Sequence, residues 1–365
     1  MDVLEASQVL TRQGHDIISF SLGEPDFDAP AEAKQACIRA IRTNQTKYTH
    51  SQGLPELRAA IVKDYKKKYG VFVDPEQVIV TPGTSPAFFL IFSVILEAGD
   101  EVILPNPHYP CDKNFVEYVG GKVRYANLLE KNGFHWDPKD VKKLLNRRTK
   151  AFFVTSPANP TGAVVLPEEY RFMAKTGKVI VSDEIYHGLT YAGREHTVLE
   201  FTKNAFVVNG FSKAYAMTGF RLGYVIAPKK YVRAMQKVQQ NFYISTNSFV
   251  QVAGIAALEK SQAYTAHMRD EYRKRRELML TGLKKIGFPI SYTPEGAFYI
   301  MANAKHIDKN SFRLAFDILE KAHVAVTPGI DFGSGGEGYL RFSYAVKPTK
   351  IKEGLRRLEQ YLKSC

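Results

Sequence analysis

The chain has 365 residues, of which 45% are hydrophobic, and its formal net charge is +13 at pH 7. This length supports a large core and two domains, and the absence of an apolar run of about 18 residues argues against a membrane span. The three cysteines are too few and too far apart to indicate a disulfide framework or a zinc site, so a reducing cytoplasm is the expected compartment.

The positive charge raises the question of a polyanionic partner. The basic residues fall in stretches such as 63–70, 142–150 and 272–278, which also carry apolar residues at helical spacing. This pattern predicts solvated helix faces. The sequence contains no zinc-finger spacing, recognition-helix pattern or aromatic RNA-binding signature, so no nucleic-acid partner is expected.

Residues 1–16 have the pattern of an amphipathic helix and lack the basic start and apolar middle of a signal peptide. Further along, short apolar runs alternate with helical patterns. Strands are expected within 77–83, 100–107, 150–160, 178–186, 204–212 and 223–228, and helices within 85–96, 112–119, 138–146 and 167–175. This alternation predicts an α/β fold with a mostly parallel central sheet and helices on both faces.

The C-terminal part has a different pattern. One long helical pattern covers about 229–283, and it is followed by apolar runs and two more helices. The runs lie at 298–303, 324–329 and 339–345, and the helices at about 310–322 and 349–363. These elements predict a smaller α+β domain. The expected division is a large domain of residues 30–260 and a small domain made of 1–29 and 261–365.

Polar residues follow the predicted strands at the ends where parallel sheets bind ligands. They are Thr84, Ser85, Tyr109, Asn159, Asp183, Tyr186, Ser212 and Lys213. Each has a simpler structural explanation, since Thr84 and Asp183 could be helix caps and a lysine is more often a solvated surface residue. Their common location nevertheless favours one shared site.

The chemistry of this set matches one cofactor. "GTSPA", residues 83–87, opens a helix whose free N–H groups favour a phosphate, and Arg221 could clamp the same phosphate. Tyr109 could stack on a flat ring, Asp183 could pair with a cationic ring nitrogen, and Lys213 could form a Schiff base. Asn159 and Tyr186 could bind a phenolate oxygen. Together these groups describe pyridoxal phosphate. No P-loop motif occurs, and no G-x-G-x-x-G follows a predicted strand.

The sequence resembles the fold-type I, class I aminotransferases. The resemblance rests on several motifs in the family's order, which span residues 20–345. They are "SLGEPDFDAP", "KYTHSQGLPELRAAI", "VTPGTSPA", "GDEVILPNPHYP", "SPANPTG", "VSDEIYHGL", "GFSKAYAMTGFRLGY", "PEGAFYI" and "YLRFSYA". "SKAYAMTGFRLGY" and "SPANPTG" are the most specific.

The resemblance implies roles for individual residues. Lys213 would hold pyridoxal phosphate as a Schiff base and then move the proton between the substrate α-carbon and the cofactor. Asp183 would keep the pyridine nitrogen protonated, with Tyr186 and Asn159 on the ring oxygen and Tyr109 against the ring. The implied phosphate ligands are Ser85, Ser212 and Arg221, with Thr84 as a helper and Tyr48 reaching in from the other subunit of a homodimer. Arg341 would bind the substrate α-carboxylate, and Gly23 and Asn159 would line the substrate pocket.

Two departures from the family pattern stand out. Gly210 replaces a hydroxyl residue that many relatives place three positions before the lysine, so one phosphate contact is missing or is supplied by water. The chain also begins closer to "SLGEPDF" than is usual. A short chain, a more open entrance and a start further upstream are the alternatives.

Three functions remain open from the sequence. The leading one is a cytoplasmic aminotransferase that moves an amino group between an L-α-amino acid and a 2-oxo acid. The second is another pyridoxal-phosphate enzyme of the same fold, such as a carbon–sulfur β-lyase, and the third is a non-catalytic ligand-sensing or DNA-associated module. The sequence does not identify the substrate pair, although Tyr243, Phe298 and Tyr299 are candidates for a pocket or an interface.

Overall fold

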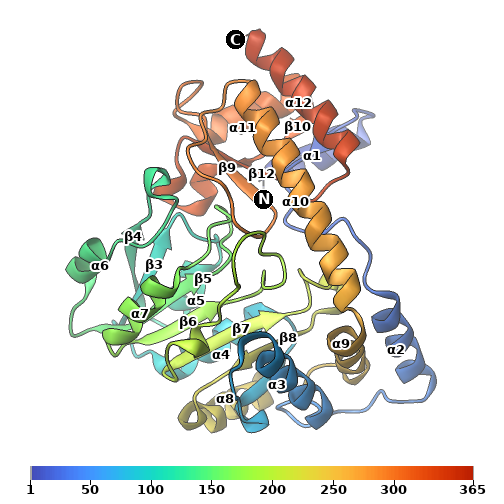
Figure 1. Cartoon of the computed structure of the whole chain (residues 1–365), viewed down its shortest axis with the longest axis vertical. Helices are drawn as coiled ribbons and strands as arrows, with labels where there is room; N and C mark the ends of the chain where they lie inside the picture. Colours follow the sequence, from blue (N-terminus) through green and yellow to red (C-terminus); the bar gives the residue numbers. More distant parts are fainter. Residues whose placement is uncertain (1, 365) are drawn as a thin grey trace.

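A computed structural model describes residues 2–364 of the chain. Figure 1 shows a large sheet with its helices in the lower half of the view and a smaller group of strands and helices above it. The long helix α10 (Gln262–Lys285) runs from the lower part to the upper part. The chain folds as α/β with a mostly parallel sheet, which confirms the predicted fold class.

The central sheet has seven strands in the order β2-β8-β7-β6-β5-β3-β4. Their bounds are β2 (Val78–Thr81), β3 (Glu101–Asn106), β4 (Lys122–Asn127), β5 (Thr149–Thr155), β6 (Val179–Asp183), β7 (Ala205–Gly210) and β8 (Gly223–Ile226). Only β8 runs antiparallel to its neighbours β2 and β7, and the other adjacent pairs are parallel. The edge strand β4 was not predicted, because its lysine and arginine interrupt the apolar run.

Two apolar layers cover the two faces of this sheet. Alternate residues of one strand enter different layers, as Phe152 and Phe153 of β5 do. The helices of this part of the fold are α2 (Ala31–Arg42), α3 (Pro55–Tyr69), α4 (Thr84–Ile95), α5 (Asp112–Tyr118), α6 (Pro138–Leu144), α7 (Pro167–Lys175), α8 (Lys229–Phe242) and α9 (Ser248–Lys260). The 3-10 helices are η1 (Pro75–Gln77), η2 (Glu130–Asn132), η3 (Val198–Glu200), η4 (Thr218–Phe220), η5 (Gly329–Phe332) and η6 (Ser334–Gly336).

The single long helical pattern expected at 229–283 is wrong, because the chain forms α8, α9 and α10 there. Ile244 has a left-handed φ of 61°, which a continuing right-handed helix excludes, and Ser261 separates α9 from α10. The periodicity of apolar residues continues across both breaks, so hydrophobic spacing alone does not reveal them.

The smaller part of the fold contains two short sheets. The three-stranded sheet has the order β11-β12-β9, and β1 pairs with β10 in parallel. The strands are β1 (Ile18–Ser19), β9 (Tyr299–Asn303), β10 (Val324–Ala325), β11 (Thr327–Pro328) and β12 (Tyr339–Ser343), and the helices are α1 (Asp2–Arg12), α11 (Ser311–Ala322) and α12 (Pro348–Lys363). The domain boundaries drawn from the sequence stay a prediction.

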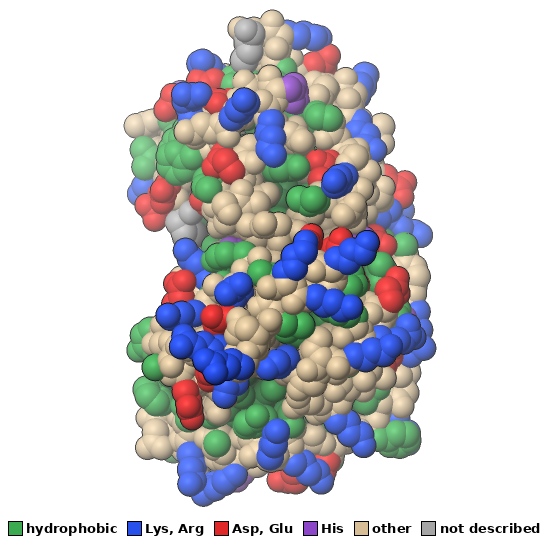
Figure 2. Space-filling model, turned by 90° about the vertical axis from the view of Figure 1, so that its left-hand side faces the viewer, with side chains coloured by type: hydrophobic (Ala, Val, Ile, Leu, Met, Phe, Trp, Pro, Cys, Tyr) green, Lys and Arg blue, Asp and Glu red, His purple; other side chains and the backbone are tan. Residues whose placement is uncertain are grey.

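The prediction that the basic stretches are solvated helix faces is wrong for two arginines of α10. Arg275 and Arg276 are buried, and each has a partner that compensates its charge or its N–H groups. Arg275 binds both oxygens of Asp26 at 2.7 and 2.8 Å, and Arg276 donates to the carbonyl of Pro294 at 2.7 Å. On the face drawn in Figure 2, the other Lys and Arg side chains spread widely, with acidic and apolar side chains between them. Within residues 2–364, none of the helices has the length and apolar character needed to cross a bilayer.

Candidate active site

Strand order brings the predicted site residues to one edge of the central sheet. Thr84, Tyr109, Asn159 and Asp183 follow or end parallel strands, so they share the carboxyl edge. Lys213 follows β7 at the same edge. Because β8 runs the other way, it begins at this edge, and Arg221 just before it is brought to the same place.

Lys213 is held as a half-buried amine. Its Nζ donates to the carbonyl oxygen of Gly23 at 2.6 Å and lies 5.9 Å from the centre of the Tyr186 ring. Burial lowers the pKa of Lys213 from 10.5 to about 8, with Arg341 acting in the same direction and Glu24 opposing it. A neutral amine is the form that attacks a carbonyl carbon, so the environment prepares this lysine for Schiff-base chemistry.

Asp183 ends β6 and is buried. Its Oδ1 accepts a hydrogen bond from the backbone N–H of Ile185 at 3.1 Å. Burial raises the pKa of Asp183 to about 7, and the neighbouring Glu184 adds to the rise. A cationic group bound against this carboxylate would offset the cost of its burial. A protonated pyridine nitrogen is such a group.

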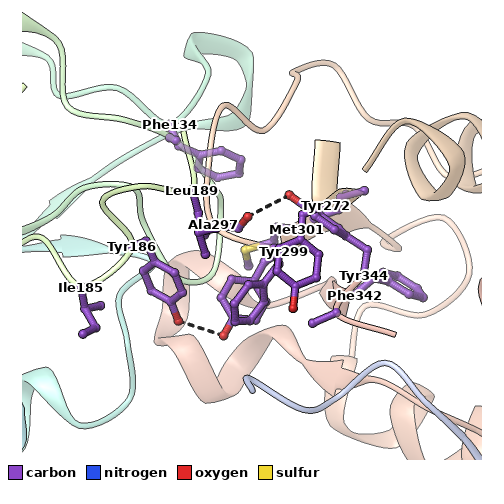
Figure 3. Close-up of a cluster of buried hydrophobic side chains, with 14 of the residues drawn as sticks. Phe134, Ile185, Tyr186, Leu189, Tyr272, Ala297, Tyr299, Met301, Phe342 and Tyr344 are labelled. Atoms are coloured by element: carbon purple, nitrogen blue, oxygen red, sulfur yellow. Dashed lines mark hydrogen bonds between the residues drawn. The ribbon is translucent and has the colours of Figure 1, made fainter. Parts of the chain in front are cut away.

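Tyr186 and Tyr299 meet hydroxyl to hydroxyl at 2.9 Å, and both side chains are buried. Figure 3 shows Tyr186, on the segment after β6, pointing at Tyr299 in β9. The same hydroxyl fixes the identity of Gly23, because a β-carbon added there would lie 2.7 Å from the Tyr299 oxygen. From the sequence, Tyr299 was only a candidate for a pocket or an interface. Its contacts with Tyr186 and Gly23 show that it lies beside the other predicted site residues.

Arg341, in β12, presents a fixed guanidinium to the site. Its Nη1 donates to Asn159 Oδ1 at 2.9 Å, and its Nη2 donates to the carbonyl of Ser21 at 2.6 Å. The guanidinium carbon lies 4.4 Å from the Tyr299 ring centre and 4.9 Å from that of Phe332. A guanidinium held in this way can bind a carboxylate with two parallel hydrogen bonds. The sequence pattern did not reveal the contribution of Ser21 or Phe332.

A candidate phosphate cradle lies where α4 begins. Gly83 precedes the helix with φ 97° and ψ 178°, a backbone conformation that is essentially restricted to glycine. A β-carbon there would lie 2.5 Å from Nη2 of Arg221, so the absence of a side chain lets the guanidinium approach. The free N–H groups of Thr84 and Ser85, the first two residues of α4, and the Arg221 charge together suit a dianion. Ser212 lies half-buried directly before Lys213.

The structure gives a physical reason for the glycine at position 210. A β-carbon at Gly210 would lie 2.9 Å from the carbonyl oxygen of Leu222 and 3.1 Å from the Cα of Gly223. β7 and the start of β8 therefore approach too closely for a hydroxyl-bearing side chain. The candidate cradle then consists of the start of α4 and Arg221.

Four of the predicted cofactor ligands are exposed, namely Tyr48, Ser85, Tyr109 and Arg221. Tyr109 is 40% exposed and borders a narrow pocket that also contacts Asn159 and His108. Tyr48, between α2 and α3, is 82% exposed, and within the described residues no hydrogen bond joins it to another predicted site residue. Such exposure is what a residue that completes a neighbouring subunit's site would show.

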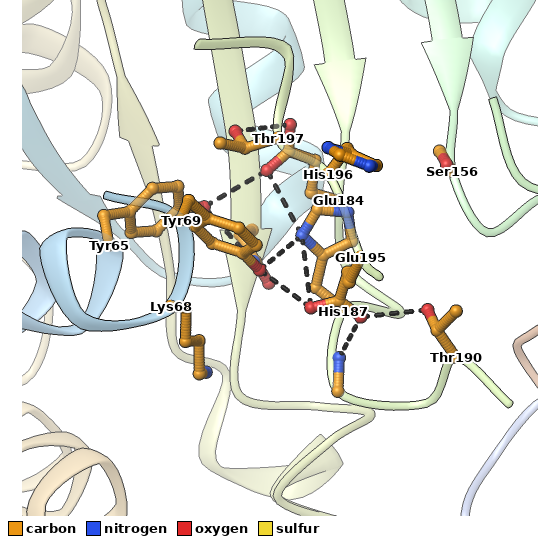
Figure 4. Close-up of polar contacts among 12 residues, drawn as sticks. Tyr65, Lys68, Tyr69, Ser156, Glu184, His187, Thr190, Glu195, His196 and Thr197 are labelled. Atoms are coloured by element: carbon orange, nitrogen blue, oxygen red, sulfur yellow. Dashed lines mark hydrogen bonds and ion pairs between the residues drawn. The ribbon is translucent and has the colours of Figure 1, made fainter. Parts of the chain in front are cut away.

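A polar cluster that the sequence did not reveal supports the segment after β6. Glu184 accepts from Thr197 Oγ1 at 2.9 Å and from the Val198 N–H at 3.0 Å. The Tyr69 hydroxyl lies 2.8 Å from His187 Nδ1 and 2.8 Å from Glu195 Oε1 (Figure 4). Because Glu184 and His187 flank Ile185 and Tyr186, these bonds fix the backbone that carries Asp183 and Tyr186.

The geometry fits pyridoxal phosphate. The cradle at Gly83 and Arg221 suits its phosphate, the Asp183 carboxylate suits its ring nitrogen, and the Lys213 amine suits its aldehyde. Asn159 and Tyr186 carry the polar groups available to its ring oxygen.

Known proteins resemble this chain over nearly its whole length. The model of the family described as aminotransferase class I and II matches residues 15–358. The (5-formylfuran-3-yl)methyl phosphate transaminase of Methanocaldococcus jannaschii is 38% identical, with 99% of this chain and 96% of that protein covered. The aspartate/prephenate aminotransferase of Thermus thermophilus is also 38% identical, with 97% and 93% covered.

Solved structures agree with these sequence matches. The aspartate aminotransferase of Thermus thermophilus with maleate superimposes with a TM-score of 0.94 at 38% identity, covering 98% of this chain and 95% of that one. An aminotransferase from Mycobacterium tuberculosis gives a TM-score of 0.96 at 34% identity, covering 100% and 96%.

Proposed function

The chain belongs to the class I and II aminotransferase family and is a pyridoxal-phosphate-dependent transaminase, and from this premise we propose that its substrates are an L-α-amino acid and a 2-oxo acid. One observation carries the proposal. The Arg341 guanidinium is held by Asn159 and Ser21 at the site that also contains the Lys213 amine. Both substrate classes carry the carboxylate that this guanidinium would bind, next to the carbon that loses or gains a proton.

We assign the following roles to the chain's own residues. Arg341 binds the substrate carboxylate and orients the α-carbon toward Lys213. Lys213, whose pKa is lowered to about 8, is the base that takes the α-proton and returns it. Pyridoxal phosphate, when bound, supplies a conjugated ring that takes up the electron pair left on that carbon.

The remaining residues hold the cofactor. Thr84, Ser85, Ser212 and Arg221 would bind its phosphate, and Asp183 would hold the proton of its ring nitrogen. Tyr186 and Asn159 would donate to its ring oxygen, Tyr109 would flank the ring, and Gly23 would border the substrate. The buried position of Asp183 and the close approach of Arg221 to Gly83 support these assignments.

The names of relatives do not identify one substrate pair. They include an aspartate/prephenate aminotransferase, a valine–pyruvate aminotransferase and a transaminase for a furan phosphate. We therefore propose only the group that Arg341 would recognise, the α-carboxylate.

We further propose that the protein is a homodimer in the cytoplasm. The exposed ring of Tyr48, matched to a family residue that reaches the phosphate of the other subunit, supports the dimer. The free thiols of Cys37 and Cys111 are compatible with a reducing compartment, and Cys365 lies outside the described residues.

A steady-state assay tests the reaction. A panel of amino acids should be paired with 2-oxoglutarate and with pyruvate, and the productive pair should give parallel double-reciprocal lines, as ping-pong transfer requires. Cystathionine should be tested alone. Release of pyruvate and ammonia from it, without transfer to any 2-oxo acid, would replace the proposal with the carbon–sulfur β-lyase alternative.

A further inference from the structure

A second pocket lies on the surface between the helices α6 and α7. Its volume is about 810 Å³, which is within the range of pockets that bind small molecules. Its lining comes from α6 and the residues after it, from α7, and from the residues between α7 and β6. Figure 1 shows these helices on its left side, which is the side that faces the viewer in Figure 2.

This pocket and the proposed active site lie at opposite ends of β6. Lys178 lines the pocket and directly precedes β6, whereas Asp183 is the last residue of the strand. A strand rises by about 3.3 Å per residue, so these two residues are roughly 16 Å apart. The proposed reaction therefore gives the pocket no role.

The charged side chains that line the pocket are mostly basic. Four are cationic and one is acidic, which gives a formal sum of +3. They are Lys142, Arg171, Lys175, Lys178 and Glu168. Within residues 2–364, no acidic side chain lies within ion-pair distance of any of the four cations. The lining thus carries a positive charge that no ion pair of the described chain neutralises.

Neighbouring lysines that do not line the pocket have acidic partners. Lys143, also in α6, lies 2.7 Å from an oxygen of Asp140, and Lys150, in β5, lies 3.3 Å from an oxygen of Asp100. The lack of partners is therefore a property of the pocket and not of this surface in general.

The positions of the four cations favour an anion from outside the chain. Lys142 and Lys175 lie in the last turns of α6 and α7, where the helix dipole stabilises a cation. Arg171 and Lys178 lie outside these turns and lack that stabilisation. Arg171 and Lys175 are also four residues apart on α7, so they share one face of the helix and their like charges repel each other. An anion bound between them would replace this repulsion with attraction.

Arg171 is held in place by an aromatic ring. Its guanidinium carbon lies 5.4 Å from the centre of the Phe201 ring, which stacks on Tyr170 with 5.3 Å between the ring centres. This contact uses the flat face of the guanidinium, so the N–H groups at its edge are available to an anion. A planar guanidinium fixed in this way suits the oxygens of a phosphate group.

The pocket also has an apolar part. Leu145 and Phe172 line it, and both side chains are half-buried and pack against the main apolar cluster. The exposed part of the Phe172 ring offers a surface on which a flat aromatic group can stack. The lining therefore combines groups for a multiply charged anion with groups for an aromatic ring system.

We propose that this pocket binds a nucleoside diphosphate, with its phosphate groups on the four cations and its base against Phe172 and Leu145. A phosphate ester has a second pKa near 6, so a nucleoside diphosphate carries about three negative charges at neutral pH. This charge balances the +3 of the lining. The site is separate from the site of amino transfer and does not depend on the identity of the transaminase substrates.

Calorimetric titration of the protein loaded with pyridoxal phosphate tests the proposal, because the cofactor then fills the candidate cradle at Arg221. The probes are adenosine diphosphate and inorganic diphosphate. The double variant Arg171→Gln/Lys175→Gln removes two cations of the pocket. Its matched control is Lys143→Gln/Lys150→Gln, which removes the same charge from the same surface outside the pocket.

The wild type should bind adenosine diphosphate, and the pocket double variant should bind it about tenfold more weakly, the effect of losing two partly exposed ion pairs. The control should resemble the wild type. No measurable binding by the wild type would overturn the proposal. An equal loss in the control would also overturn it, because the probe would then respond only to net charge.

The second probe tests the apolar part of the pocket. Inorganic diphosphate lacks the base, so it should bind the wild type more weakly than adenosine diphosphate. Phe172→Leu keeps an apolar side chain but removes the ring, and it should weaken adenosine diphosphate binding while leaving inorganic diphosphate binding unchanged. Equal affinities of the two probes for the wild type would refute the assignment to a nucleoside diphosphate.

Discussion

Gly83 and Arg221 are packed so closely that a single added carbon would collide: a β-carbon at Gly83 would lie 2.5 Å from Arg221 Nη2. This contact joins the start of α4 to the chain entering β8. It explains why a glycine with φ 97° occurs where the helix begins. The proposed phosphate cradle depends on it.

Gly83→Ala should therefore weaken pyridoxal phosphate binding strongly. The new methyl group displaces the guanidinium, and an alanine in this conformation, which is essentially restricted to glycine, also costs about 1–3 kcal/mol. Gly14→Ala is the control, because Gly14 has φ 95° but nothing lies within 4 Å of its added β-carbon. Equilibrium titration with the cofactor checks this, and equal affinities of the two variants would refute the cradle.

The planar guanidinium of Arg341 leads to a second prediction. Arg341→Lys removes the planar donors that reach Asn159 and Ser21, so KM for the amino acid should rise by about 10- to 100-fold. Arg313→Lys, at a side chain 73% exposed on the surface, should leave KM unchanged. A KM that stays constant in Arg341→Lys would place the carboxylate elsewhere.

The lowered pKa of Lys213 predicts how the stability of the cofactor-free protein depends on pH. Between about pH 8 and 10.5, the unfolded chain holds a proton that the folded chain has lost, so stability rises with pH in this window. Lys213→Met removes the free-energy cost of placing a protonated amine at this position of the folded protein. The variant should be more stable than the wild type below about pH 8, with the difference shrinking toward pH 10.5. Urea unfolding measures this, and a difference independent of pH would contradict the lowered pKa of Lys213.

The ion pair between the buried Arg275 and the more exposed Asp26 anchors the segment whose carbonyls meet Lys213 and Arg341. Asp26 keeps some contact with water, its side chain being 23% exposed, so Arg275→Gln should cost about 1–3 kcal/mol, below the loss for a fully buried pair. Arg269→Gln on the same helix, at a side chain 42% exposed, should cost less than about 0.5 kcal/mol. Denaturant midpoints of both variants decide whether this contact stabilises the fold.

If each active site contains residues of both subunits, mixing two inactive variants should restore activity. Lys213→Ala and Tyr48→Ala homodimers should both lose activity. A mixed dimer would contain one site with Lys213 from one chain and Tyr48 from the other, and activity should return on mixing. No recovery in proven mixed dimers would mean that Tyr48 does not act across the interface.

The strands of the central sheet were largely predictable from the sequence because buried parallel strands are continuous apolar runs. The sequence did not predict β4, because it is a polar edge strand. It did not predict the helix breaks at Ile244 and Ser261, because the hydrophobic spacing continues through them. Lys213 and Asp183 could be placed together, since strand ends converge at one edge. The contacts of Tyr299 and Ser21 could not, because they join segments that are distant in the sequence.

The central claim is that Lys213 and Arg341 serve amino transfer. Its most direct test is the absorbance spectrum of the purified protein with bound pyridoxal phosphate, recorded before and after a single amino acid is added. The account predicts that the cofactor band moves to the position of the pyridoxamine form, with one equivalent of 2-oxo acid released, and that Lys213→Ala does not make this change. An unchanged spectrum with every common amino acid, in protein that holds the cofactor, would contradict it.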